Sequence, residues 1–203
     1  MSGQAICREA PYPAPQGVAP GDQAQEGLFV RSLENRHVAK RFGRDTEPPE
    51  FGYRVKASEW TWSAKEELDG LSVDHAECVG TPACALLLHR DNVHLRHVVV
   101  IDIAMLSEDL GIPIIAVYDP NPDGAENPCH YYLQPGTGSV EGLVYRLKIT
   151  YPVETNPKIP RNQDAIESLR AEREQYERTF RVHRDARAGC LRASQTAIPS
   201  EAE

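Results

Sequence analysis

The run His97-Val98-Val99-Val100-Ile101-Asp102-Ile103 constrains the fold more than any other part of the sequence. It is nearly continuous in apolar character and rich in β-branched residues, which favour extended backbone. Such a run is typical of a central strand that is covered on both faces. The chain must therefore supply packing elements to both sides of a sheet. Asp102 is the exception within the run, because a buried carboxylate is costly without a partner.

Short apolar segments around this strand supply the rest of an α+β fold. Strands are expected at 28–33, 53–56, 71–74, 113–118, 129–133 and 143–151, and helices at 82–88 and 104–110. Pro82 suits the first turn of a helix, and Gly111 suits the end of one. These segments predict a single α+β domain over residues 28–151, built on a central mixed or antiparallel sheet.

The segments outside this domain differ from it in composition. Residues 1–27 are rich in Pro and Gly and hold too little apolar surface to offset the entropy of ordering, so they are expected to form a disordered arm. Residues 152–161 are Pro-rich and polar, which indicates a linker. A disordered tail is expected over 189–203.

Residues 162–188 predict an amphipathic helix after the linker. Ile166, Leu169, Tyr176 and Phe180 recur at helical spacing and form a narrow apolar seam, nearer to a coiled-coil stripe than to a broad core face. A seam of this kind is a candidate surface for docking.

Charge and cysteine content limit the class of function. Lys and Arg number 22 against 30 Asp and Glu, a net charge of -8, which argues against generic nucleic-acid binding. No apolar run approaches the roughly 20 residues that cross a bilayer. The start of the sequence lacks the basic and apolar regions of a secretory signal. The five cysteines are therefore expected to be reduced thiols in the cytoplasm.

Histidine and cysteine offer an alternative in the form of a zinc site. The candidate ligands are His75, Cys78, Cys84, Cys129 and His130. Their spacing contains neither CxxC nor HxxxH, and Cys84 in PACALLL fits a small buried hydrophobe equally well. We expect no metal site, and no residue pattern identifies a cofactor.

A second group of polar residues precedes the apolar strand. His94 lies between His89 and His97 in the segment HRDNVHLRH. Together with Arg31, His94 is a candidate for binding a phosphate or carboxylate, because guanidinium and imidazole groups both recognise such anions. The alternative is a solvated loop that joins a helix to a strand.

Two segments, Gly70-Leu71-Ser72-Val73-Asp74 and Asn127-Pro128-Cys129-His130, resemble parts of a group of small uncharacterised bacterial proteins. That group has an LSVD segment, a hydrophobic strand, a short helix and a later NPxH segment. The resemblance covers about residues 28–133, and His75 stands where the group has Arg. It implies that Ser72, Asp74 and His130 meet, with Asp74 and His130 forming an acid–base pair or an orienting hydrogen bond. The alternative is that Asp74 caps a turn and His130 bonds to backbone.

Two functions are compatible with these observations. The first is a cytosolic bacterial protein-interaction module, whose C-terminal helix docks on a protein partner or on a second copy. It is supported by the absence of nucleophile-elbow and phosphate-loop motifs. The alternative is a small enzyme acting on a nucleotide-like or phosphorylated ligand. In that case Asp74 and His130 are the catalytic residues, and Arg31, Ser72 and His94 bind the ligand.

Overall fold

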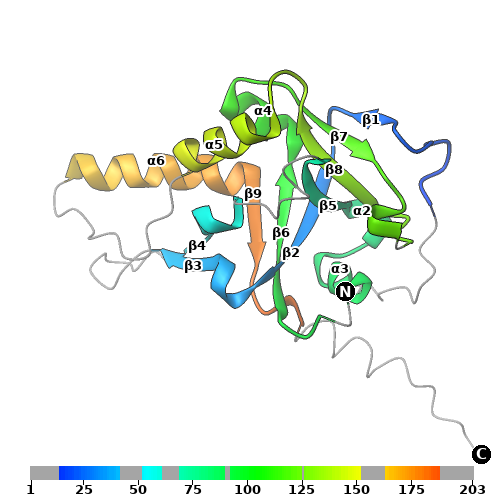
Figure 1. The fold of residues 1–203 in the computed structure, drawn as a ribbon. Coiled ribbons are helices and arrows are strands. Elements are labelled where there is room, and N and C mark those ends of the chain that lie inside the picture. The colour runs from blue at the N-terminus through cyan, green and yellow to red at the C-terminus, as the bar shows by residue number, and fades with distance from the viewer. Residues whose placement is uncertain are drawn as a thin grey trace, which may run out of the picture.

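The computed structural model describes residues 14–41, 52–60, 69–89, 92–124, 126–151 and 163–187. These residues form an α+β fold with a seven-stranded antiparallel sheet (Figure 1), which confirms the predicted fold class. In spatial order the strands are β1 (Gln23–Ala24), β7 (Ile114–Tyr118), β8 (His130–Pro135), β5 (Leu71–His75), β2 (Leu28–Glu34), β6 (Leu95–Asp102) and β9 (Phe180–His183). A separate hairpin pairs β3 (Val38–Arg41) with β4 (Gly52–Val55).

Helices lie on both sides of this sheet. They are α2 (Ala76–Val79), α3 (Pro82–Leu88), α4 (Ile103–Leu110), α5 (Val140–Thr150) and α6 (Gln163–Thr179). Within the described ranges, the short 3-10 helices η1 (Asn35–His37), η2 (Ala57–Trp60) and η3 (Pro122–Gly124) lie in the connections. Helix α4 contacts both α5 and α6 beside the larger core, whereas α2 and α3 lie by the other face (Figure 1).

Strand β6 is covered on both faces, as the apolar run predicts. Val99 and Ile101 belong to the larger core, whereas Val98 and Val100 pack on the opposite face beside α3. Asp102 ends the strand and caps α4, because its Oδ1 accepts hydrogen bonds from the backbone N–H groups of Ala104 and Met105 at 3.1 Å. The acidic residue therefore has the partners that its position demands.

The predicted strand at 143–151 is wrong, because residues 143–150 lie in helix α5 and Tyr151 is its C-cap. Leu143, Leu147 and Tyr151 are spaced by four residues and are all buried, so one helical face meets the core. Ser139 caps the helix by accepting a hydrogen bond from the N–H of Gly142. The apolar residues fit a helical period that the short-strand interpretation overlooked.

The predicted helix over 162–188 ends at Thr179, and the chain continues as strand β9. Phe180–His183 pairs antiparallel with Val98–Ile101 of β6 and so forms one edge of the main sheet. Tyr176 and Phe180 are each only 1% exposed and belong to the larger core. They are internal residues of the fold and not part of an outer seam. The side chains of Ile166 and Leu169 lie outside the described residues.

Part of the predicted N-terminal arm is ordered in the sheet. Within residues 1–27, Gln23 and Ala24 form strand β1 and pair with Val117 and Ala116 of β7. Two backbone hydrogen bonds join Gly21 and Asp22 to Tyr118 as well. Residues 1–13, the predicted linker at 152–161 and the predicted tail at 189–203 lie outside the described residues. No helix in the described ranges is both long enough and apolar enough to cross a membrane.

Candidate active site

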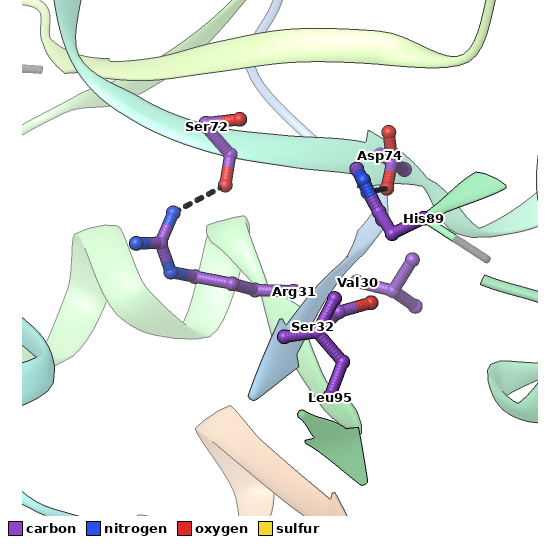
Figure 2. Close-up of a pocket in the computed structure, with 7 residues that line it drawn as sticks. All are labelled: Val30, Arg31, Ser32, Ser72, Asp74, His89 and Leu95. Atoms are coloured by element: carbon purple, nitrogen blue, oxygen red, sulfur yellow. Dashed lines mark hydrogen bonds and ion pairs between the residues drawn. The ribbon is translucent and has the colours of Figure 1, made fainter. Parts of the chain in front are cut away.

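A break in the sheet opens a cavity between β2 and β5. The two strands pair only where Phe29 faces His75 and Val30 faces Asp74. Beyond that point the Arg31 side chain connects them, because its Nη1 donates a 2.7 Å hydrogen bond to the carbonyl oxygen of Ser72. A cavity of about 190 Å³ lies there (Figure 2) and is called the Ser72 cavity below. Its lining residues are Val30, Arg31, Ser32, Ser72, Asp74, His89 and Leu95.

Arg31 is anchored by a buried carboxylate. Its Nε donates to Glu59 Oε1 at 3.0 Å, and His37 Nδ1 lies 2.9 Å from Glu59 Oε2. Because Glu59 is only 7% exposed, the pair is shielded from solvent. The guanidinium thus holds β2 against β5 at the edge of the cavity.

Gly70 places β5 close to β8 at the start of the site. Its φ of +109° is in the region that favours glycine. A Cβ at this position would lie 2.5 Å from the carbonyl oxygen of Leu133. The next residues, from Leu71 onward, can then enter the antiparallel ladder with β8, where Ser72 faces Tyr132 and Asp74 faces His130.

Ser72 and His130 are joined by a hydrogen bond whose direction follows from the rest of the ring. His130 Nδ1 lies 2.9 Å from the carbonyl oxygen of Asp119, which can only accept, so Nδ1 carries a proton. In the neutral ring Nε2 is then an acceptor, and the Ser72 hydroxyl donates to it over 2.9 Å. Burial lowers the pKa of His130, against opposing effects of Asp119 and Asp74. The pair therefore combines a hydroxyl at the cavity with a neutral, oriented base.

Asp74 is held by a different pair of side chains. His89 Nε2 donates to Asp74 Oδ2 at 3.2 Å, and Asn127 Nδ2 donates to Asp74 Oδ1 at 2.8 Å. Burial alone would lower the pKa of His89, but the hydrogen bond and the charge of Asp74 outweigh it and raise that pKa. The two histidines near Asp74 consequently differ: His89 favours the protonated form, and His130 favours the neutral form.

The Ser72 cavity is rich in hydrogen-bond donors. The Ser32 hydroxyl oxygen is buried and has no hydrogen-bond partner. Within the described part of the chain, His89 Nδ1 has no partner either, since the bond to Asp74 uses Nε2. These two groups can donate to a ligand in the cavity, whereas the Ser72 hydroxyl hydrogen is already donated to His130 Nε2. An oxygen-rich ligand would satisfy them, because leaving a buried polar group without a partner is costly.

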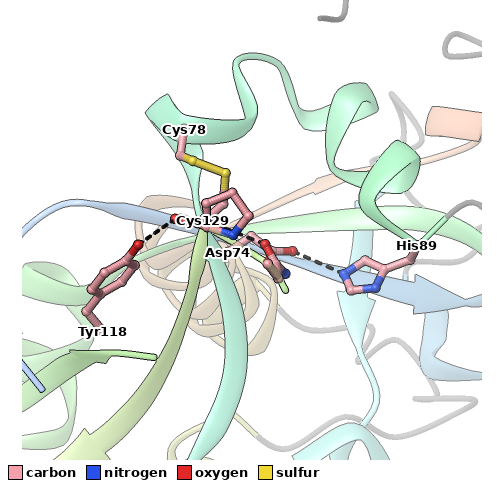
Figure 3. Close-up of a disulfide and its surroundings, with 7 residues drawn as sticks. Asp74, Cys78, His89, Tyr118 and Cys129 are labelled. Atoms are coloured by element: carbon pink, nitrogen blue, oxygen red, sulfur yellow. Dashed lines mark hydrogen bonds and ion pairs between the residues drawn. A yellow bond between two sulfur atoms is a disulfide. The ribbon is translucent and has the colours of Figure 1, made fainter. Parts of the chain in front are cut away.

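A disulfide fixes the segment that carries His130. Cys78 of α2 is bonded to Cys129, which directly precedes β8, and the two Cα atoms are 5.5 Å apart (Figure 3). Tyr118 of β7 also contacts this segment, because its Oη donates a hydrogen bond to the carbonyl oxygen of Pro128 at 3.1 Å. Cys84, buried in α3, is also disulfide-bonded.

The expectation of reduced thiols is wrong for these cysteines. Cys78 and Cys129 are 51 residues apart in sequence and meet because β5, which precedes α2, pairs with β8. Their sulfur atoms are consequently not available as the thiolate ligands of the alternative zinc site. Among the residues that the structure describes, no group of three or more His, Cys, Asp or Glu side chains is arranged to hold a metal ion.

The structure brings most of the candidate residues together. Arg31, Ser72 and Asp74 line the Ser72 cavity, and His130 reaches it through the hydroxyl of Ser72. Asp74 faces His130 across the ladder but forms its hydrogen bonds with His89 and Asn127. His94 is separate from the site: it is exposed in the turn before β6 and does not line the cavity.

Sequence reasoning missed three members of the site. His89 belongs to the same histidine group as His94, and its place at the end of α3 was the available signal. Asn127 lies in the NPxH segment, where its role as a donor to Asp74 was not identified. Ser32 gives no signal in the sequence, because only the separation of β2 from β5 exposes it to the cavity.

Comparison with known proteins finds no matching family model, no matching curated protein and no matching solved structure. The functional conclusion therefore rests on the arrangement of the side chains.

Proposed function

We propose that the protein is an enzyme in which Ser72 attacks the phosphorus atom of a small phosphorylated ligand and His130 accepts the serine proton. The observation that carries this proposal is the hydrogen bond from the Ser72 hydroxyl, at the cavity, to Nε2 of a buried histidine whose other nitrogen is held by a carbonyl. A serine with an adjacent oriented base is the arrangement that covalent catalysis requires.

The reaction balances as a transfer to oxygen. The Ser72 oxygen forms a bond to phosphorus, the hydroxyl proton passes to His130 Nε2, and the ester oxygen leaves with the electron pair of the broken P–O bond. His89 in its protonated form would supply a proton to that oxygen or bind a phosphoryl oxygen. His130 then gives up its proton to solvent and His89 takes one up from solvent. Neutral His130 next accepts a proton from the water that attacks the phosphorus atom, and it returns this proton to the Ser72 oxygen as the Ser72–phosphorus bond breaks.

The choice of a phosphorylated ligand rests on the donors in the Ser72 cavity. Ser32 and His89 offer hydrogen bonds to oxygen atoms, and a tetrahedral phosphate can use both while the Ser72 oxygen attacks the phosphorus atom. The cavity of about 190 Å³ has room for about six water molecules at roughly 30 Å³ each. It therefore suits a phosphoryl group with its nearest neighbours, and the rest of a larger ligand would lie outside it.

Covalent labelling tests the proposal. Diisopropyl fluorophosphate loses fluoride when a serine oxygen attacks its phosphorus, so intact mass and peptide mapping locate the adduct. The wild-type protein is expected to gain one adduct on Ser72, and Ser72→Ala none. His130→Gln should label about 100-fold more slowly, which is within the usual contribution of a general base.

Ser168→Ala is the matched control, since Ser168 is an exposed serine of α6 that does not line the Ser72 cavity. This variant should still be labelled at Ser72, and unlabelled samples of all variants should have similar melting temperatures. An adduct elsewhere in the wild type, or equal labelling rates for folded His130→Gln and wild type, would contradict the proposal.

The interaction-module hypothesis has less support. Tyr176 and Phe180, two of the four residues in the predicted seam, are buried in the core. Docking of a protein partner or of a second copy through the C-terminal helix therefore stays a prediction, and residues of the helix other than Tyr176 would have to form the contact surface. The likeness to small bacterial proteins also stays a prediction.

The cellular compartment in which the protein acts is also part of the proposal. A cytoplasmic location is the expectation from the sequence, but the Cys78–Cys129 disulfide favours an oxidising environment, where such bonds persist. We propose that the protein acts in a compartment where this disulfide remains formed, because the disulfide fixes the segment that carries His130.

A further inference from the structure

A second cavity lies beside the Ser72 cavity on the same face of the sheet. Ser72 faces Tyr132 across the β5–β8 ladder, and Tyr132 faces Val117 across the β7–β8 ladder. Because side chains of directly paired residues lie on the same face, these three residues form one row across three strands. The row leads from the Ser72 cavity to a hollow over β7 and β8.

This hollow, called the Tyr132 cavity, has a volume of about 340 Å³. Its lining residues are Pro20, Gly21, Asp69, Val117, Tyr118, Asp119, Tyr132 and Gln134. It is within the range of roughly 300 to 1,000 Å³ that is usual for sites of small ligands. The Ser72 cavity alone is below this range.

His130 lies between the two cavities and contacts the lining of both. Its Nε2 accepts from Ser72, and its Nδ1 donates to the carbonyl oxygen of Asp119 in the wall of the Tyr132 cavity. The rings of His130 and Tyr132 meet edge to face, with centroids 4.6 Å apart. The Ser72–His130 pair therefore lies beside both cavities.

The two cavities differ in hydrogen-bonding character. In the Ser72 cavity the one lining carboxylate, Asp74, is held by His89 and Asn127, and Ser32 and His89 offer donors. Asp69 and Asp119 give the Tyr132 cavity an acidic lining. Gln134 uses its amide nitrogen to donate to the carbonyl oxygen of Asp69 at 2.6 Å, which leaves its amide oxygen as an acceptor. The Tyr132 ring and Val117 add an apolar surface against which a flat ring can lie.

We infer that the Tyr132 cavity is the subsite for the nucleoside part of a nucleoside monophosphate whose phosphate occupies the Ser72 cavity. Sugar hydroxyls and base amino or imino groups are donors that match the acidic lining, and the base matches the aromatic surface. This inference deepens the proposed function and rests on it for the position of the phosphate. It assigns the substrate class that the Ser72 cavity leaves open.

Isothermal titration tests the subsite with five probes: inorganic phosphate, AMP, CMP, GMP and UMP. For the wild-type protein at least one nucleotide should bind about tenfold or more tightly than phosphate, since base stacking and hydrogen bonding add to the phosphate contacts. Val117→Phe, which fills the Tyr132 cavity, should reduce the affinity for that nucleotide to the level of phosphate. Phosphate affinity itself should change by less than about twofold, which also shows that the variant is folded.

Ile115→Phe is the matched control. Ile115 is half-buried on the same strand and faces Gln134, so it shares the face of Val117 but does not line the cavity. This variant should keep the nucleotide preference. Equal affinity for phosphate and all four nucleotides in the wild type would overturn the subsite, as would an unchanged preference in Val117→Phe.

The titration and the labelling experiment test different parts of the proposal, so one can fail while the other succeeds. If Ser72 is labelled but no nucleotide is preferred over phosphate, the subsite is wrong and the nucleophile stands. If a nucleotide preference is lost in Val117→Phe but Ser72 is not labelled, the subsite is supported as a binding site and the covalent step is wrong.

Discussion

The two histidines near Asp74 have opposite protonation preferences, and the cause lies in single atoms. His89 donates to the Asp74 carboxylate, which stabilises its charged form and raises its pKa in spite of burial. His130 is buried and faces a serine hydroxyl and a carbonyl, and its pKa is lowered. Groups whose environments separate their pKa values in this way are suited to opposite roles as acid and base.

The labelling rate of Ser72 should depend on pH with a maximum near the ordinary histidine pKa of 6.5. Below that value the rate falls as His130 takes up a proton, at a pH lower than 6.5 because its pKa is lowered. Above it the rate falls as His89 loses its proton, at a pH higher than 6.5 because its pKa is raised. The measurement is the rate of adduct formation by mass spectrometry across this range.

His89→Gln distinguishes the two limbs. It should lose the decline at high pH and keep the decline at low pH, since Gln cannot titrate. A wild-type rate that rises monotonically through pH 6.5 and above would show that protonated His89 takes no part.

At the scale of elements, the Cys78–Cys129 disulfide connects α2 to the start of β8. The segment it anchors contains Asn127, which binds Asp74, and leads directly into His130. The bond thus restrains two contacts of the candidate site as well as the fold.

Replacing both cysteines, Cys78→Ala with Cys129→Ala, should lower the free energy of unfolding by about 4 kcal/mol, because the bond closes a long loop in the unfolded chain. The loop spans a sequence separation of 51 residues. Urea titration measures the loss, and the folded double variant should also label more slowly at Ser72. An unchanged urea midpoint would show that the bond adds nothing to stability.

The end of α6 and strand β9 are part of the core and not an appendage. Phe180 is 1% exposed, contacts the rings of Trp60, Tyr151 and Tyr176, and lies on a strand paired with β6. If Phe180 served to dock a partner, Phe180→Asp would leave the domain folded. The observed burial predicts the opposite, because an unpaired charge in the core is strongly unfavourable.

Phe180→Ala gives a measurable form of this prediction, with an expected loss of about 3–5 kcal/mol in the free energy of unfolding. Tyr145→Ala is the control, since Tyr145 is an aromatic residue that is 66% exposed. Its replacement should change stability by less than about 0.5 kcal/mol. Equal, small effects in the two variants would contradict the assignment of Phe180 to the core.

At the scale of the molecule, the elements with a strong local signal could be predicted from the sequence. Such a signal comes from residues that are adjacent in sequence. Examples are the apolar run of β6, Pro82 at the start of α3 and Gly111 at the end of α4. The 143–151 segment is short and apolar enough to fit a strand or a helix, so its type was decided by packing. Phe180 fits the helical spacing of the residues before it, but it lies in strand β9 because the chain there pairs with β6.

The candidate site could be predicted only in part, because its contacts join residues far apart in sequence. The proximity of Ser72, Asp74 and His130 was an implication of the resemblance and not of any spacing in the chain. The Ser72–His130 bond spans 58 residues and the Asn127–Asp74 bond spans 53, so both depend on the β5–β8 register. The Cys78–Cys129 bond depends on the same register, which no local pattern reveals.

The proposed attack by Ser72 depends on one claim, that a neutral His130 accepts the hydrogen bond of Ser72 through Nε2. Nitrogen chemical shifts of the His130 ring, followed by NMR over a pH titration, report directly which nitrogen carries the proton. We expect Nδ1 to be protonated and Nε2 to be unprotonated near neutral pH, with a pKa below 6.5, and Ser72→Ala to shift the Nε2 signal. A ring protonated on Nε2 near neutral pH would contradict the claim, because the nitrogen facing Ser72 could not take its proton.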